Sequence, residues 1–136
     1  MSPLSSKLKR ILLVEDEVDI QMVARLALED VGGFEVSVCA SGEEALRDGP
    51  GFRPQLILLD FMMPGGMDGR LTLEAFRGSE ALASVPVIFL TARAQLEEVE
   101  EYHRLGAVDV IIKPFDPMTL AEQIETIWAR HVRLSG

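Results

Sequence analysis

The sequence has few of the residues that mark secreted, membrane-bound or nucleic-acid-binding proteins. Its only cysteine, Cys39, allows no internal disulfide and fits a reducing compartment. No apolar run approaches the length of a membrane span or of a signal-peptide core. Lysine and arginine number 13 against 22 acidic residues, and the net charge of −9 argues against a nucleic-acid surface. These shortages predict a cytoplasmic protein without nucleic-acid or membrane partners.

Apolar residues, by contrast, are plentiful. They make up 48% of the 136 residues and charged residues 26%, which is the profile of one ordinary globular domain with a proper core. We place this domain at residues 9–132, with a flexible N-terminal tail at 1–8 and a C-terminal tail at 133–136. The basic residues Lys7, Lys9 and Arg10 are then expected in a solvated leading segment. Within this length we expect no second domain that could bind DNA or act as an enzyme.

Short apolar runs alternate with helical patterns along the chain. Runs rich in branched residues are typical of parallel strands covered on both faces, and they lie at 11–14, 56–59, 87–90 and 110–112. Segment 35–38 alternates apolar and polar residues, which suits a sheet edge. This alternation predicts an α/β fold of the (βα)5 type, a doubly wound five-stranded parallel sheet with right-handed crossovers. With strand order 2-1-3-4-5 the fold would be flavodoxin-like.

Two of the predicted helices have clear sequence signals. The first has a single buried face, at the 3, 4, 7, 8, 11 spacing of Ile20, Val23, Ala24, Ala27, Leu28 and Val31. The last is expected to begin with Asp116 as N-cap and Pro117 in its first turn. Its apolar stripe would be Leu120, Ile124, Ile127 and Trp128.

Polar residues directly follow the buried strands. Glu15 and Asp16 follow the first, Asp60 the run at 56–59, Thr91 the run at 87–90, and Lys113 the last. In an open α/β sheet, ligands bind beyond the carboxyl ends of the strands, where the strand order reverses. With the order 2-1-3-4-5, these side chains would therefore share one crevice.

The residue types in this crevice suggest phosphoryl chemistry. Two carboxylates about 4 Å apart repel by roughly 4 kcal/mol at an effective dielectric of about 20. Three of them invite a divalent cation, and oxygen ligands suit Mg²⁺. Lys113 adds a compact positive charge for an anionic group, and Thr91 can donate a hydrogen bond. A carboxylate nucleophile, a cation and a lysine together describe the formation of an aspartyl-phosphate.

Five separated motifs carry a family resemblance. They are Val14-Glu15-Asp16-Glu17, Asp60 with Met63-Pro64 and Asp68-Gly69, Thr91-Ala92, Gly106-Ala107, and Lys113-Pro114-Phe115. In this order and spacing the sequence resembles a response-regulator receiver domain of two-component signalling, over residues 9–130. The resemblance implies a phosphoacceptor that catalyses only its own phosphorylation and dephosphorylation. It also implies a histidine kinase or a histidine phosphotransfer protein as donor, and a monomer or weak phosphorylation-dependent dimer.

The resemblance also assigns roles to single residues. Asp60 would be the phosphoacceptor and a Mg²⁺ ligand, Asp16 a direct Mg²⁺ ligand, Glu15 a ligand through water, and Met62 a ligand through its backbone carbonyl. In the same way Thr91 would sense the phosphoryl group and Lys113 would pair with it. The peptide before Pro114 is expected to be cis.

The sequence departs from the family pattern at two places. Gly65, Gly66 and Met67 make three residues where the family usually has two between the proline and the Asp-Gly pair, so we expect an altered loop and intact chemistry. Val110 stands where many receivers carry Tyr or Phe. A valine cannot make the inward swing that accompanies phosphorylation there. We therefore expect this domain to respond to phosphorylation in a different way.

Three other functions share parts of this pattern. A flavodoxin-like cofactor binder has the fold, but its first loop would be rich in Gly, Ser and Thr, whereas the loop here is acidic. A phosphatase or ATPase of the aspartyl-phosphate type would carry a second Asp where Met62 stands. A degenerate receiver would act as a fixed binding module. The remaining residues have simple structural interpretations: Cys39 as a buried inert thiol, Tyr102 and Trp128 as packing residues, and the acidic run 97–101 as a solvent face.

Overall fold

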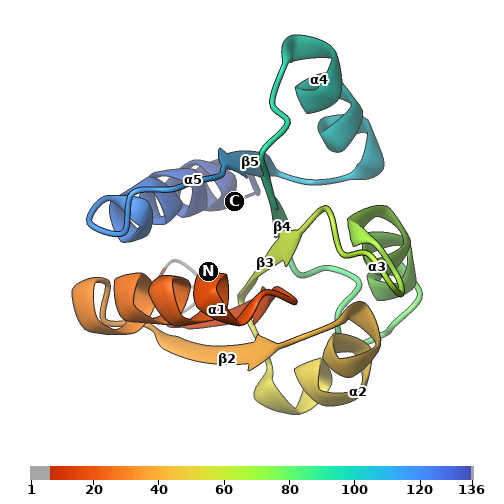
Figure 1. The fold of residues 1–136 in the computed structure, drawn as a ribbon, viewed down its shortest axis with the longest axis horizontal. Helices are drawn as coiled ribbons and strands as arrows, with labels where there is room; N and C mark the ends of the chain where they lie inside the picture. The colour runs from red at the N-terminus through yellow and green to blue at the C-terminus, as the bar shows by residue number, and fades with distance from the viewer. Residues whose placement is uncertain (1–6, 136) are drawn as a thin grey trace.

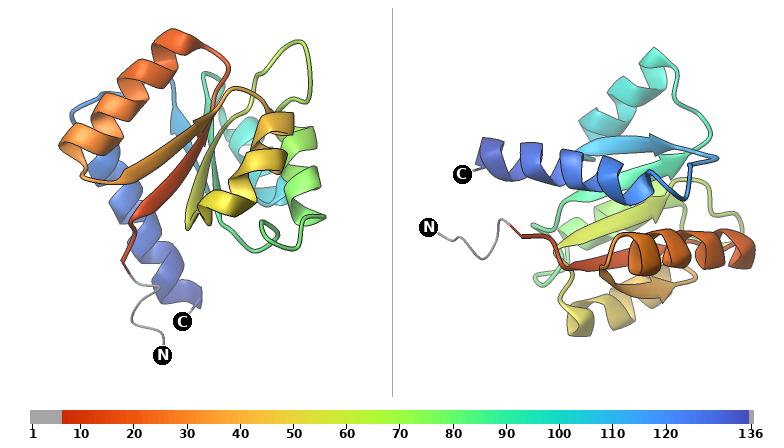
Figure 2. Two further views of the ribbon diagram at one scale, coloured as in Figure 1. Left: turned by 90° about the horizontal axis from the view of Figure 1, so that it is seen from below. Right: turned by 90° about the vertical axis from the view of Figure 1, so that its left-hand side faces the viewer.

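In the computed structural model, which describes residues 7–135, a five-stranded parallel sheet lies between two layers of helices (Figures 1 and 2). The sheet order is β2-β1-β3-β4-β5, which confirms the doubly wound fold. The strands are β1 (Arg10–Val14), β2 (Glu35–Cys39), β3 (Leu56–Asp60), β4 (Val87–Thr91) and β5 (Asp109–Ile112). The helices are α1 (Val18–Arg25), η2 (Leu26–Val31), α2 (Gly42–Phe52), α3 (Gly69–Arg77), α4 (Leu96–Leu105) and α5 (Leu120–Ser135).

Each face of the sheet has its own apolar core. Helices α1 and α5 cover one face, and α2, α3 and α4 cover the other (Figure 1). Strand β3 serves both cores, because Leu56 and Leu58 point into the first and Ile57 and Leu59 into the second. Because side chains on both faces of the central strands are buried, the sequences of these strands are unbroken apolar runs. Among the described residues, no helix is both long and apolar enough to cross a membrane.

The predicted buried face of the first helix is only partly right. Ala24, Ala27 and Leu28 are buried as expected, whereas Val23 is 41% exposed and Val31 45% exposed. The regular α-helix ends at Arg25, and the chain continues as a wider π-helical segment, η2. There the Gly32 amide donates to the carbonyl of Ala27, five residues back. A period of 3.6 residues carried through residue 31 therefore misplaces the last turn.

The ordered domain extends beyond the predicted boundaries at both ends. Leu8, assigned to the N-terminal tail, is buried in the core, and the amides of Lys9 and Arg10 both donate to Oε1 of Gln55. Residues 1–6 of that tail lie outside the described part of the chain. At the other end, α5 continues through residue 133 to Ser135. Of the leading basic residues, Arg10 begins β1, whereas Lys7 and Lys9 precede it and are exposed to solvent.

The last helix begins later than predicted. Asp116 accepts a hydrogen bond from the Met118 amide at 2.9 Å through its side chain, and one from the Leu120 amide at 3.0 Å through its carbonyl. These bonds form a turn, and α5 starts only at Leu120. Asp116 does accept capping hydrogen bonds, but they close a turn that precedes the helix. The predicted apolar stripe is confirmed: Leu120, Ile124, Ile127 and Trp128 are all buried.

Candidate functional site

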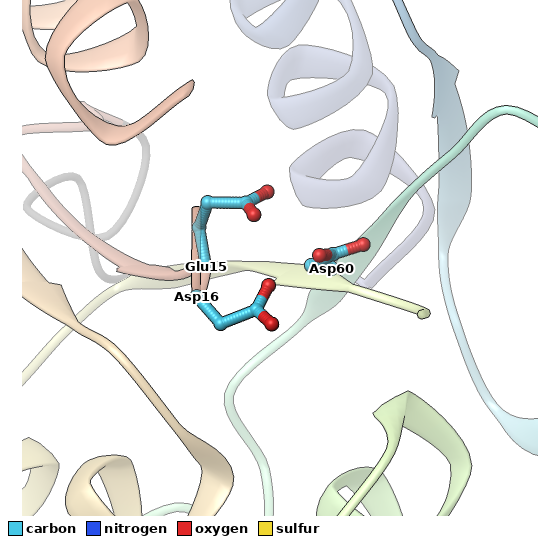
Figure 3. A group of neighbouring side chains, drawn as sticks. All are labelled: Glu15, Asp16 and Asp60. Carbon is cyan, nitrogen blue, oxygen red and sulfur yellow. The ribbon is translucent and has the colours of Figure 1, made fainter. Parts of the chain in front are cut away.

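Three carboxylates meet where the strand order of the sheet reverses. Glu15 and Asp16 directly follow β1, and Asp60 is the last residue of the neighbouring strand β3. Figure 3 shows the three side chains converging between these strand ends. One oxygen from each lies within 4.8 Å of the others, which is close enough for a shared metal ion. The prediction that the topology gathers these residues is confirmed.

Lys113 joins this cluster from the loop after β5. Its Nζ lies 3.0 Å from Oε1 of Glu15 and 3.1 Å from Oδ1 of Asp60. Its own backbone amide donates to the carbonyl of Thr91 at 2.9 Å, which holds the loop against the end of β4. The peptide between Lys113 and Pro114 is cis, as the resemblance predicted.

The acidic groups are unusually far from water. Glu15 is fully buried and Asp60 is only 2% exposed. Burial raises the pKa of Glu15 to about 7, with a further rise from the charge of Asp60, against the lowering effect of hydrogen bonds from Glu17 and Lys113. Burial likewise raises the pKa of Asp60 above its ordinary value, although Lys113 opposes the shift.

The Lys113 ammonium alone does not balance this charge. Burial lowers its pKa, but the hydrogen bond to Glu15 and the charges of Asp60 and Glu15 outweigh that effect and raise it. One positive charge thus faces two buried carboxylates, with the partly buried Asp16 beside them. Because every remaining donor is an oxygen, the cluster suits a hard divalent cation.

Backbone hydrogen bonds hold the Asp60 carboxylate in place. Its Oδ1 accepts from the amide of Met62 at 3.1 Å, and the intervening Phe61 amide donates to the carbonyl of Leu90. The turn that follows β3 is therefore tied both to the carboxylate and to the adjacent strand. Met62 is an exposed residue, with a relative accessibility of 56%.

Thr91 ends β4, beside the paired residues Asp60 and Leu90. It is buried, and its Oγ1 accepts from the amide of Arg93 at 3.0 Å. The same Oγ1 lies 3.3 Å from the hydroxyl oxygen of Tyr102, which comes from α4. From the sequence, Tyr102 is expected only to pack in the core. The packing is confirmed, but no local pattern indicated that its hydroxyl would reach Thr91.

The Asp68-Gly69 pair has a structural role at the start of α3. Oδ1 of Asp68 accepts from the Leu71 amide at 2.9 Å and so caps α3. A Cβ on Gly69 would lie 2.6 Å from the Cα of Phe61, so only glycine lets the start of α3 approach the turn after Asp60. The motif thus packs the helix against the site, and contributes no ligand of its own.

The longer loop over the site leaves the carboxylate cluster intact. Gly65 adopts a φ of +91°, a conformation that side chains rarely take. The loop borders a cavity of about 310 Å³ on the Asp16 side of the cluster, lined by Asp16, Ala40, Ser41, Glu43, Met63, Pro64, Gly65, Gly66 and Met67. Asp16 remains in the acidic group beneath it.

Cys39 lies at the end of β2 and takes no part in this cluster. It is 2% exposed, and burial raises the pKa of its thiol to about 11, with further contributions from the negative charges of Glu44 and Asp48. A thiol in this state is inert at neutral pH, as we predicted.

Comparisons with known proteins agree with the site. The family described as "Response regulator receiver domain" matches residues 11–125. The probable transcriptional regulator ycf27 of Cyanophora paradoxa is 35% identical over 122 residues, covering 90% of this chain and 49% of the relative. The phosphate regulon transcriptional regulatory protein PhoB of Escherichia coli is 34% identical over 122 residues. The match covers 90% of this chain and 52% of PhoB. This chain thus spans about half the length of these relatives.

Solved structures support the same assignment. The Vibrio cholerae chemotaxis protein CheY4 superposes with a TM-score of 0.80 at 30% identity, covering 89% of this chain and 99% of its own. The receiver domain of the Francisella response regulator 1452 gives 0.78 at 27% identity, covering 90% of this chain and 98% of its own. The family match covers the sheet from Ile11 onward, including the carboxyl ends of all five strands. The chain therefore belongs to the response regulator receiver domains, the phosphoacceptor modules of two-component signalling.

Proposed function

We propose that Asp60 is the phosphoacceptor and that the cluster around it holds Mg²⁺. Asp16 and Asp60 would bind the ion directly, Glu15 through water, and Met62 through its backbone carbonyl. Support comes from the oxygen-only donor set within 4.8 Å and from the excess of buried negative charge. When bound, the cation would draw negative charge from the phosphoryl oxygens and relieve the repulsion among the carboxylates.

The chain's own side chains would carry out the transfer. An Asp60 carboxylate oxygen attacks the phosphorus as the bond to the donor's nitrogen breaks, giving an aspartyl-phosphate. The Lys113 ammonium, now 3.1 Å from Asp60, would pair with a phosphoryl oxygen, and the Thr91 hydroxyl would donate to another. Attack by water on the same phosphorus would return the free carboxylate and inorganic phosphate. Apart from these steps on itself, we propose no enzymatic activity.

The observation that carries this proposal is the shared contact of the Lys113 ammonium with Glu15 and Asp60. It supports the proposal because a positive charge lies beside the carboxylate that would carry the phosphoryl group. Since Asp60, Thr91 and Lys113 are all in place, we favour an active phosphoacceptor over a degenerate receiver that only binds partners.

Mass spectrometry with a small phosphodonor tests the proposal. Incubation with phosphoramidate and Mg²⁺ should add one phosphoryl group, and Asp60→Asn should take up none. Asp48→Asn is a matched control, because Asp48 lies on the surface of α2 and pairs with Arg47; it should be labelled like the wild type. A phosphoryl group on another residue of the wild type would refute the assignment of Asp60.

Receiver domains of response regulators partner with kinases or phosphotransfer proteins. For this chain we propose a histidine kinase or histidine phosphotransfer protein as donor, working in the cytoplasm. A cavity of about 430 Å³ opens beside Lys113, lined mainly by apolar residues of α1 and the loops after β4 and β5, and would receive part of such a partner.

Two further expectations about partners stay proposals. Several relatives are named transcriptional regulators, and this chain covers about half of each. The net charge of −9 leads us to propose that this domain itself contacts no nucleic acid, whatever larger protein contains it. We also propose a monomer or a weak dimer that phosphorylation strengthens, which light scattering with and without phosphodonor would test.

A further inference from the structure

Tyr102 is a buried tyrosine whose hydroxyl joins helix α4 to the end of β4. Its side chain is almost inaccessible to solvent. The hydroxyl donates to the carbonyl of Arg93 at 2.9 Å and lies 3.3 Å from Oγ1 of Thr91. Thr91 ends β4 and Arg93 lies in the β4–α4 connection that follows it, next to the proposed phosphorylation site. The one tyrosine of the chain is therefore in contact with the residue proposed to bind the phosphoryl group.

Two phenylalanines hold the ring of Tyr102 in position. Phe61, the residue after Asp60, packs against it with ring centroids 4.8 Å apart, and Phe89 of β4 does so at 5.4 Å, both edge to face. Val110 of β5 is partly buried against the same core, and its side chain has no polar atom. An aromatic ring thus does occupy the space beside Thr91, but it comes from α4 and not from position 110.

The hydroxyls of Thr91 and Tyr102 have one hydrogen each, so each can donate to only one acceptor at a time. Thr91 Oγ1 already accepts from the Arg93 amide at 3.0 Å, and the Tyr102 hydrogen is directed to the Arg93 carbonyl. The single hydrogen of the Thr91 hydroxyl is therefore directed to Tyr102, or to the same carbonyl at a longer 3.4 Å. A phosphoryl oxygen would compete for this hydrogen, and hydrogen bonds to ionised acceptors are about twice as strong as neutral ones.

We propose that Tyr102 detects phosphorylation of Asp60 through the Thr91 hydroxyl and transmits it to helix α4. This inference rests on the proposed function of Asp60. When Thr91 donates to the phosphoryl group, the Tyr102 hydroxyl loses its donor and the β4–α4 connection shifts with Thr91. The shift would also alter a cavity of about 380 Å³ between the turn after β3 and α4, which Tyr102 lines together with Phe61, Met62 and Arg93.

A single ¹³C-labelled tyrosine carbon tests the contact in the unphosphorylated protein. Because the chain contains one tyrosine, labelling Cζ gives one NMR signal that belongs to Tyr102. Thr91→Val removes the hydroxyl and should shift this signal without any phosphodonor. Thr126→Val is the control, since it removes a hydroxyl that bonds only within α5 and should leave the signal in place. An unchanged signal in Thr91→Val would overturn the inference.

Amide exchange over Leu96–Leu105 then tests transmission to α4. Phosphoramidate and Mg²⁺ should change the exchange rates there in the wild type and shift the Tyr102 signal. Tyr102→Phe keeps the ring packing but should lose most of the change in α4, while intact mass still shows phosphoryl uptake. If Tyr102→Phe is phosphorylated and α4 responds as in the wild type, this inference fails and the proposed function stands. If the wild type takes up no phosphoryl group, both fail.

Discussion

The Nζ of Lys113 lies 3.1 Å from Oδ1 of Asp60, so the loop after β5 and the end of β3 share one ion pair. The same ammonium contacts the buried Glu15 at 3.0 Å. Removing the single ammonium would leave the buried carboxylates without compensation, whereas removing one carboxylate would reduce the excess of negative charge. The stability of the domain should therefore respond to every change of charge at this site.

Mg²⁺ is expected to stabilise the fold, and Asp60→Asn to reduce that effect. Binding to the native state adds RT ln(1 + [L]/Kd), about 1.4 kcal/mol at a tenfold excess over the dissociation constant. For a domain of this size, that is on the order of 5 °C in melting temperature. Asp60→Asn removes one of the repelling charges, so without metal it should melt above the wild type and gain less from Mg²⁺.

Lys113→Met sharpens this comparison. Without the ammonium, nothing reduces the repulsion among the carboxylates, so the stabilising effect of Asp60→Asn should be larger. Asp48→Asn, on the surface of α2, is the control and should respond to Mg²⁺ like the wild type. Thermal melting curves with and without Mg²⁺ would reveal all of these differences. If the melting curves do not change with Mg²⁺ and Asp60→Asn is no more stable than the wild type, the carboxylates do not form a common metal site.

The pH dependence of the metal-free protein should reflect Glu15. Its pKa rises from an ordinary value of 4.5 to about 7 on folding, chiefly through burial. Folding therefore favours the protonated acid, so this contribution to stability is complete below pH 4.5 and is lost as the pH rises through 7. Urea unfolding across this window should show a steeper decline in the wild type than in Glu15→Gln. Parallel profiles for the two proteins would show that folding does not change the pKa of Glu15.

Met62 and Arg93 are expected to protect the aspartyl-phosphate from water. Both line the cavity beside the turn after Asp60, and Met62 is an exposed apolar side chain at its edge. Met62→Asn combined with Arg93→Glu should admit water and shorten the lifetime of the phosphoryl group, followed by mass spectrometry after removal of the donor. Met22→Asn, an exposed methionine on α1, is the control. Equal or slower decay in the double variant would point to the Gly65–Gly66 loop as the barrier.

Gly69→Ala should destabilise the domain. The added Cβ would lie 2.6 Å from the Cα of Phe61, a backbone atom that cannot move aside easily. Overpacking of this kind costs about 1–3 kcal/mol. Gly51→Ala is the matched control: it lies in α2 with no atom within 4 Å of the new Cβ, and alanine should stabilise a helix by roughly 0.5–1 kcal/mol. Chemical denaturation measures both changes, and two variants of equal stability would refute the packing argument for Gly69.

The strands and the carboxylate cluster could be predicted from the sequence because their signals are local. A strand buried on both faces, such as Leu56–Asp60, must be a continuous apolar run, so the charged residue at its end is conspicuous. Once the strands are placed, topology alone brings Glu15 and Asp60 to the same edge, since both follow parallel neighbours.

Only the tertiary structure decided the details that depend on packing between elements. The π-helical turn at Leu26–Val31 changed which side chains of that helix face the core, and a fixed helical period cannot anticipate it. Leu8 is buried in the core of one sheet face, although its own segment carries no sequence signal for burial. The contact of Tyr102 with Thr91 joins hydroxyls on different elements. Its geometry depends on how α4 packs against β4, and no sequence pattern records that.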